Sequence, residues 1–136
     1  MNLKKIKIIN VFGVFALSFL FHFMYEWWPN VVTSIFFPVN ESIWEHMKIL
    51  FGSIIISGVV QKIIIKLKKE TFKNVCISNY IAAITSIIIF LIIYLPIYNI
   101  IGEKLIITII IMLITIIISE IISYYIIKRH KDLKLE

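Results

Sequence analysis

Four long apolar runs, separated by short polar segments, account for most of the chain. They cover roughly residues 8–27, 41–65, 75–98 and 105–127. Each run is close to the ~20 residues that a helix needs to cross the hydrocarbon core of a bilayer. Isoleucine is frequent in these runs and would favour strands in water, but a single strand in lipid leaves its backbone groups unpaired. The pattern therefore predicts an all-α polytopic membrane protein, with one domain (residues 1–136) of four transmembrane helices.

The composition agrees with this prediction. Hydrophobic residues make up 60% of the chain, whereas soluble domains usually contain about 45–50% apolar residues. The first run follows a lysine-rich start, as a signal peptide does, but it continues without a cleavage-type ending and we interpret it as a retained helix. Cys76 is the single cysteine, so an internal disulfide and a cysteine-rich metal site are both excluded.

Almost all basic residues fall on one side of the predicted helices. They flank the N-terminus, the segment between the second and third runs, and the C-terminus: Lys4, Lys5, Lys7, Lys62, Lys66, Lys68, Lys69, Lys73, Lys128, Arg129, Lys131 and Lys134. Only Lys48 and Lys104 fall on the other side. The positive-inside rule then predicts a multi-pass cell-membrane protein with both termini in the cytoplasm. The net charge of +6 would suit a nucleic-acid surface, but the location of the basic residues at one membrane face indicates contact with anionic lipid instead.

Acidic and histidine side chains gather where the first two runs meet the predicted outer interface. His22 and Glu26 are four residues apart and share one helix face. Glu41 and Glu45 are also four apart on the predicted second helix, and Lys48 continues their face. Because ionisable groups near the bilayer are costly unless they are paired, this cluster is a candidate functional site.

The donor types in the cluster suit a divalent transition metal. Helix pairs that present Glu and His side chains build such sites in helical bundles. The candidate ligands of Zn, Mn, Fe or Ni are His22, Glu26, Glu45 and His46, with Glu41 as the candidate general base. Side chains that would contact a substrate or support the ligands are Asn40, Trp44 and Lys48.

The same residues also have a purely structural interpretation. Asn40 is a good helix N-cap, and Ser42 with Glu45 fits a capping box. The cluster would then close the turn between two helices and carry no chemistry. The apolar stretch Val31–Phe37 in this turn is expected to lie in the interface or to fold back over the helices as a lid.

A second polar layer lies deeper in the predicted bundle. Glu120 falls well inside the fourth run, with Gln61 and Asn79 at a similar depth. The structural interpretation pairs Glu120 with Lys62 or with these two carboxamides, and the functional one is a proton or cation relay. The small residues of Ser53-x-x-x-Ser57 and Ala82-x-x-x-Ser86 are expected to allow close helix approach.

One string in the chain resembles a known group of proteins. The string is Asn40-Glu41-Ser42-x-Trp44-Glu45-His46-x-Lys48, and it is preceded by His22-x-x-Tyr25-Glu26-Trp27. It is similar to a group of small bacterial integral membrane proteins that are classified as a domain of unknown function. The resemblance implies a bacterial membrane protein with several spans, and it does not imply any particular activity.

Three kinds of function fit these observations. The cluster could bind a cation or a small polar solute, as part of a small transporter or channel that would form a homo-oligomer. It could belong to a metal-dependent hydrolase or transferase that acts on a lipid-type substrate. In the third interpretation the protein is a structural or partner-binding subunit of the membrane.

Overall fold

The computed structural model describes residues 2–129, and it contains helices and connecting loops only. The four long helices are α1 (Leu3–Trp27), α3 (Ile43–Leu67), α4 (Val75–Ile101) and α5 (Leu105–Lys128), and a short helix α2 (Val31–Phe36) follows α1. Each long helix is long and apolar enough to cross a membrane. The predicted all-α fold with four candidate spans is therefore confirmed. His130, Lys131 and Lys134 lie outside the described residues.

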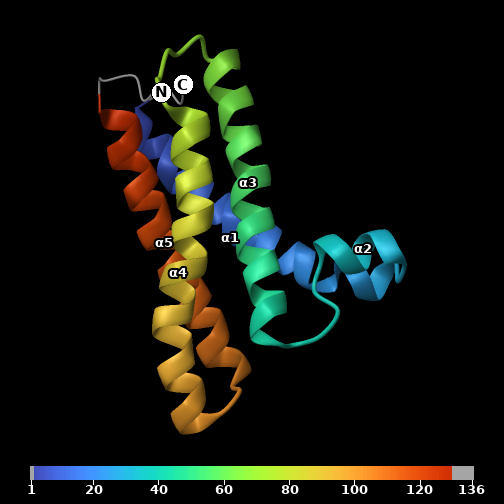
Figure 1. Ribbon diagram of the computed structural model, residues 1–136. Helices are drawn as coiled ribbons and strands as arrows, with labels where there is room; N and C mark the ends of the chain where they lie inside the picture. The colour runs from blue at the N-terminus through green and yellow to red at the C-terminus, as the bar shows by residue number, and fades with distance from the viewer. Residues whose placement is uncertain (1, 130–136) are drawn as a thin grey trace.

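The long helices form a ring of four. α1 packs on α3 and α5, and α4 packs on the same two helices from the other side (Figure 1). α1 crosses the bundle obliquely, so its C-terminal part diverges from α5 and leads to α2 beside the bundle (Figure 1). This divergence opens space between α1 and α5 at the end of the bundle where α3 begins.

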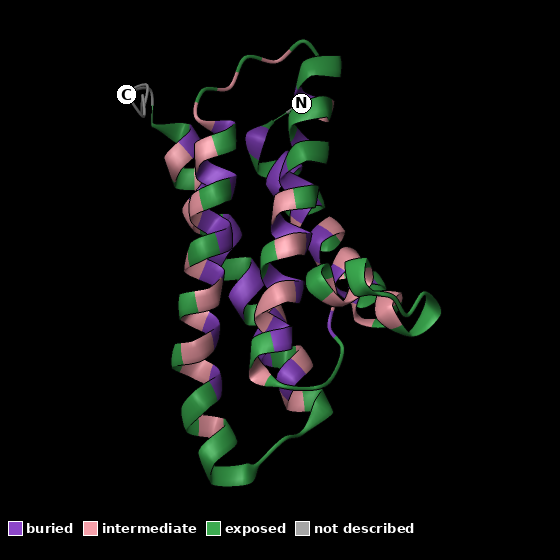
Figure 2. Cartoon of the chain, turned by 45° about the vertical axis from the view of Figure 1, so that its right-hand side comes forward, coloured by how far each residue is buried: buried purple, intermediate pink, exposed green. Residues whose placement is uncertain are grey.

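The interior of the bundle combines a core of large apolar side chains with many small polar residues, and many further large apolar side chains point outward. Figure 2 shows the buried faces of the helices turned toward one another. Ser53 and Ser57 on α3 lie 3.0 and 2.6 Å from Ser18 and Asn10 on α1, measured between side-chain oxygens. Small residues let helices approach closely where lipid offers no hydrophobic drive between them. The expected close approach at Ser53 and Ser57 is confirmed.

The two ends of the bundle differ in composition. At the end that holds the start of α1 and the α3–α4 loop, exposed basic residues gather, and we call it the basic end: Lys4, Lys5, Lys62, Lys66, Lys68, Lys69, Lys73, Lys128 and Arg129. The opposite end, which holds the start of α3 and the α4–α5 loop, exposes aromatic residues and is called the aromatic end: Trp27, Trp28, Trp44 and Tyr98.

The turn that leads into α3 differs from its prediction. α3 begins at Ile43, and Ser42 is its N-cap residue without a side-chain cap bond. Asn40 Oδ1 accepts from the backbone N–H of Ser42 at 2.9 Å, and Glu45 Oε2 accepts from that of Val39 at 3.0 Å. The predicted N-cap at Asn40 and the predicted capping box of Ser42 with Glu45 are therefore wrong. The reason is that Asn40 closes a local turn of its own, a common alternative for Asn side chains.

The apolar stretch after α1 folds as α2. Asn30 and Thr33 form a capping box at its N-terminus, with Thr33 N–H donating to Asn30 Oδ1 at 3.0 Å. α2 buries none of its residues and lies beside the bundle (Figure 2). It does not fold back over the helices as a lid.

Candidate functional site

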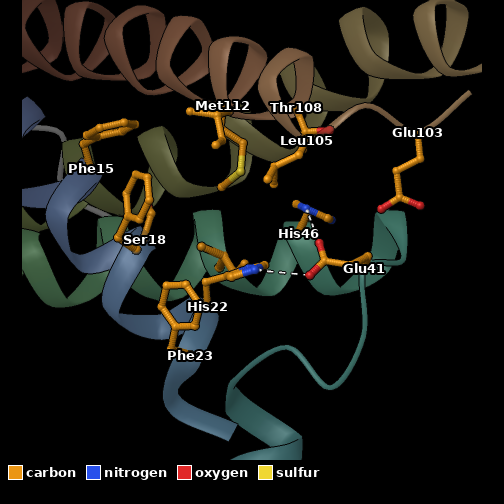
Figure 3. Close-up of a pocket in the computed structure, with 13 residues that line it drawn as sticks. Phe15, Ser18, His22, Phe23, Glu41, His46, Glu103, Leu105, Thr108 and Met112 are labelled. Atoms are coloured by element: carbon orange, nitrogen blue, oxygen red, sulfur yellow. Dashed lines mark ion pairs between the residues drawn. The ribbon is translucent and has the colours of Figure 1, made fainter. Parts of the chain in front are cut away.

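A pocket of about 430 Å³ opens between α1, α3 and α5 at the aromatic end. Its walls are mostly apolar side chains: Phe15, Phe19, Phe23, Ile49, Leu105, Ile109 and Met112. Its polar side chains include His22, Glu41 and His46, together with Glu103 from the α4–α5 loop (Figure 3). The pocket exists because α1 diverges from α5 there, and α3 forms its floor.

The Glu41 carboxylate lies between two imidazole rings. Its Oε1 is 3.1 Å from His22 Nε2, and its Oε2 is 3.6 Å from His46 Nε2 (Figure 3). Glu41 belongs to the turn before α3, which the hydrogen bond from Ser42 N–H to Asn40 Oδ1 holds in shape. The Glu41 side chain is 51% exposed, whereas that of His46 is 5% exposed. A half-exposed carboxylate therefore links one buried and one partly exposed imidazole.

The His46 ring is fixed by its surroundings. Its Nδ1 lies 2.9 Å from the backbone oxygen of Ser42, which only accepts hydrogen bonds, so Nδ1 carries a proton. The ring is nearly parallel to those of Phe90 and Tyr94, at interplanar angles of 18° and 26°. His46 Nε2 is thereby turned toward Glu41.

The structure divides the predicted cluster. His22, Glu41 and His46 come together, but Glu45 Oε2 lies 2.6 Å from Lys48 Nζ and bonds to the preceding loop. Lys48 Nζ also donates to the backbone oxygens of Ser34 and Phe37. The expectation that Glu41 and Glu45 share a helix face is wrong, because Glu41 precedes the helix.

Other predicted residues lie outside the pocket. Glu26 and Trp44 are exposed, and neither lines it. Asn40 contributes through the turn that carries Glu41. Within residues 2–129, no three His, Cys, Asp or Glu side chains are arranged as they stand to hold a metal ion.

The prediction missed Glu103 and the α5 wall of the pocket. Glu103 sits in the loop between the last two apolar runs, beside Gly102, which adopts a positive φ of 68°. That loop is at the same end of an antiparallel bundle as Glu41, so the topology alone could have placed Glu103 near the cluster. Which α5 residues face α1 depends on the tilt of α1, which the sequence pattern does not reveal.

The second polar layer is present, but its central ion pair differs from the predicted one. Glu120 Oε2 lies 2.9 Å from Lys7 Nζ, and Glu120 Oε1 accepts from Asn10 Nδ2 at 2.8 Å. The predicted partner Lys62 is exposed. α1 begins at Leu3, so Lys7 belongs to the helix and is buried, and its interpretation as a charge of the N-terminal tail is wrong.

Comparison with known proteins assigns the chain to a family. No curated protein and no solved structure matches it. A family model described as "Family of unknown function (DUF6512)" matches residues 1–136. This agrees with the resemblance of the sequence to an uncharacterised family of small membrane proteins. The chain belongs to the Family of unknown function (DUF6512).

Proposed function

We propose that the pocket at the aromatic end binds an amphiphilic molecule with a positively charged headgroup, such as a long-chain amine. The main support for this proposal is that one pocket has both apolar walls and the His22–Glu41–His46 cluster. Apolar pockets with a few convergent polar groups are the usual form of small-molecule sites. The alkyl chain would lie against the aromatic and aliphatic walls, and the headgroup would meet the carboxylate.

The charges near the pocket favour a cation. Glu41 and Glu103 each contribute a carboxylate to its lining. The nearby ammonium group of Lys48 is held by Glu45 and by two backbone oxygens, so it does not neutralise Glu41. An ammonium headgroup would complement this arrangement and would gain charge-assisted hydrogen bonds.

The proposal also includes an orientation and a path of entry. The basic end carries the lysine-rich segments, so by the positive-inside rule the aromatic end lies at the outer face of the cell membrane. The ligand would then come from the outer leaflet, and it would enter from the side between α1 and α5. Solutes with no alkyl chain would leave the apolar walls of the pocket without contact.

Binding of dodecylamine to the purified protein in a neutral maltoside detergent tests this proposal. We expect saturable binding to the wild type, and an affinity lower by roughly tenfold to a hundredfold in Glu41→Gln, because a hydrogen bond to a charged group is lost. Dodecanol, with the same chain and no charge, should bind more weakly than the amine. Equilibrium dialysis measures the affinity of the wild type for the amine, that of Glu41→Gln for the amine, and that of the wild type for dodecanol.

The matched control is Glu70→Gln, which removes a carboxylate from the α3–α4 loop at the basic end. It should bind dodecylamine like the wild type. Equal affinities of Glu41→Gln and wild type for the amine would refute the proposed role of Glu41. Equal binding of amine and alcohol would refute the charge preference.

The orientation of His46 favours a second candidate function, the binding of a transition metal. Histidines that bind metals usually donate their other ring N–H to a backbone carbonyl or a carboxylate, as His46 Nδ1 does to Ser42. Because these side chains do not form a metal site as they stand, metal binding would require them to draw together. His22 Nε2, His46 Nε2 and Glu41 would then be the ligands, and Glu26 and Glu45 would not. Such a centre could support hydrolysis or group transfer on a lipid-type substrate.

Elemental analysis of the purified protein tests this second candidate. We expect stoichiometric Zn, Mn, Fe or Ni in the wild type, and its loss in both His22→Ala and His46→Ala. The matched control is His130→Ala, the third histidine of the chain, which should keep the metal. A metal content that is the same in all four proteins would refute this centre.

A further inference from the structure

The Lys7 ammonium is surrounded by four oxygen atoms from three other helices. Its Nζ lies 2.6 Å from Ser123 Oγ, 2.9 Å from Glu120 Oε2, 3.2 Å from Gln61 Oε1 and 3.3 Å from Asn79 Oδ1. All five residues are buried, with Lys7 at 5% and Glu120 at 2% relative exposure. We call these four oxygens the oxygen cage. It lies toward the basic end, apart from the pocket at the aromatic end.

The cage offers more acceptors than Lys7 can use. A lysine ammonium has three N–H groups, whereas four oxygens surround it. A free ammonium ion has four N–H groups, and a potassium ion of similar size is also bound by several oxygens. Carboxylate, carboxamide and hydroxyl oxygens are hard ligands, which suit such ions better than they suit soft metals.

Gln61 and Gly58 show that the oxygens are directed at a positive charge. Gln61 turns its oxygen to Lys7, and its buried Nε2 is left without a hydrogen-bond partner among the described residues. Asn79 reaches the cage by passing over Gly58, where an added Cβ would lie 2.6 Å from Asn79 Nδ2. A buried donor without a partner is costly. The Gln61 carboxamide therefore points its oxygen at Lys7 at the cost of a hydrogen bond from its Nε2.

A groove gives access to the cage. It has a volume of about 480 Å³, lies between α1 and α5, and is lined by Lys4, Lys7 and Glu120 together with apolar and tyrosine side chains. The neighbouring residues Lys4, Lys5, Ile8 and Ile9 on α1 are exposed. Leu3 and Ile6 on the same turn are buried against Ile65 and Ile127, so withdrawing Lys7 from the cage requires this turn of α1 to leave those contacts.

We propose that the oxygen cage is a binding site for a monovalent cation of ammonium or potassium size, in which Lys7 Nζ is the tethered occupant. A free cation takes its place when Lys7 withdraws. The Glu120 carboxylate favours binding of the free cation, because a buried carboxylate without a positive partner is strongly destabilising. Nothing in this proposal depends on the ligand of the other pocket.

Thermal unfolding of Lys7→Ala in detergent tests the proposal. The melting temperature is compared in ammonium chloride, potassium chloride and choline chloride at equal ionic strength. We expect it to be roughly 5 °C higher in ammonium or potassium than in choline, at a cation concentration about ten times Kd. The wild type and Lys5→Ala, the matched control, should melt alike in the three salts. In Lys7→Ala/Glu120→Gln the response should vanish.

A measurement on the wild type keeps the proposal testable if Lys7→Ala does not fold. An amine-reactive acylating reagent is applied in potassium chloride and in choline chloride, and the labelling of Lys7 and Lys4 is followed by mass spectrometry. We expect potassium to raise the labelling rate of Lys7 severalfold and to leave that of Lys4 unchanged. The proposal is overturned if Lys7→Ala melts alike in all three salts, or if potassium does not change the labelling of Lys7.

Discussion

At the scale of single residues, the polar end of the pocket depends on which nitrogen of each imidazole carries the proton. His46 Nδ1 faces the carbonyl oxygen of Ser42 at 2.9 Å and must donate to it. His22 Nε2 faces Glu41 Oε1 at 3.1 Å and must donate there. In the neutral form of each ring, the two histidines are therefore expected to adopt opposite tautomers, which ¹⁵N chemical shifts of the labelled protein distinguish directly.

This tautomer assignment has a clear control. In Glu41→Gln the new carboxamide offers both a donor and an acceptor, so the His22 preference should weaken while the His46 preference stays. The same tautomer in both histidines of the wild type would contradict the geometry of the cluster.

At the scale of elements, α2 is a short helix that contributes no buried residue to the bundle. It has six residues and buries none of them, and its N-terminal capping box joins Asn30 to Thr33. Replacing Asn30 by Ala should cost about 1 kcal/mol of local helix stability. We expect faster hydrogen exchange of the α2 amides in Asn30→Ala, with the melting temperature of the bundle unchanged. A fall of several degrees would show that α2 supports the four long helices.

The long helices could be predicted from the sequence because each is one apolar run of membrane length. Three of the predicted runs begin within two residues of the observed helix, whereas α1 begins at Leu3, five residues before the predicted start at residue 8. The short helix α2 could not be predicted in this way, because six residues give no periodic signal and α2 is held by its N-terminal cap and by Lys48, which donates to the backbone oxygen of Ser34. The tilt of α1, which opens the pocket, could not be predicted from the hydropathy of the sequence.

The candidate site was predicted in part for a related reason. His22, Glu41 and His46 belong to two helices joined by a short turn, so hairpin topology brings them close. The rotation of each helix decides which neighbours join them, and it turns Glu26 to the surface and Glu45 toward Lys48.

Lys7 was misplaced because a lysine close to the N-terminus resembles a tail charge. Its spacing from Asn10, Ser18 and His22, in steps of three, eight and four residues, does indicate one helix face. The polar face of α1 could therefore have been extended back to Lys7 from the sequence alone.

At the scale of the whole molecule, the charge difference between the two ends predicts how the bundle lies in the membrane. Cys76 is the only cysteine, and it is exposed near the start of α4, at the basic end. We expect a membrane-impermeant maleimide to label Cys76 only after the cells are made permeable. Glu103→Cys in a Cys76→Ser background moves the thiol to the α4–α5 loop and should be labelled in intact cells. The opposite labelling pattern would invert the proposed orientation.

We propose above that an amphiphile occupies the space between α1, α3 and α5. Photo-crosslinking with a long-chain amine that carries a diazirine in its alkyl chain tests it most directly. We expect crosslinks to residues that line the pocket, such as Phe19, Ile109 and Met112, and their loss when unlabelled dodecylamine is added in excess. Crosslinks confined to outward residues such as Ile84 and Ile92, with no competition by the amine, would contradict it.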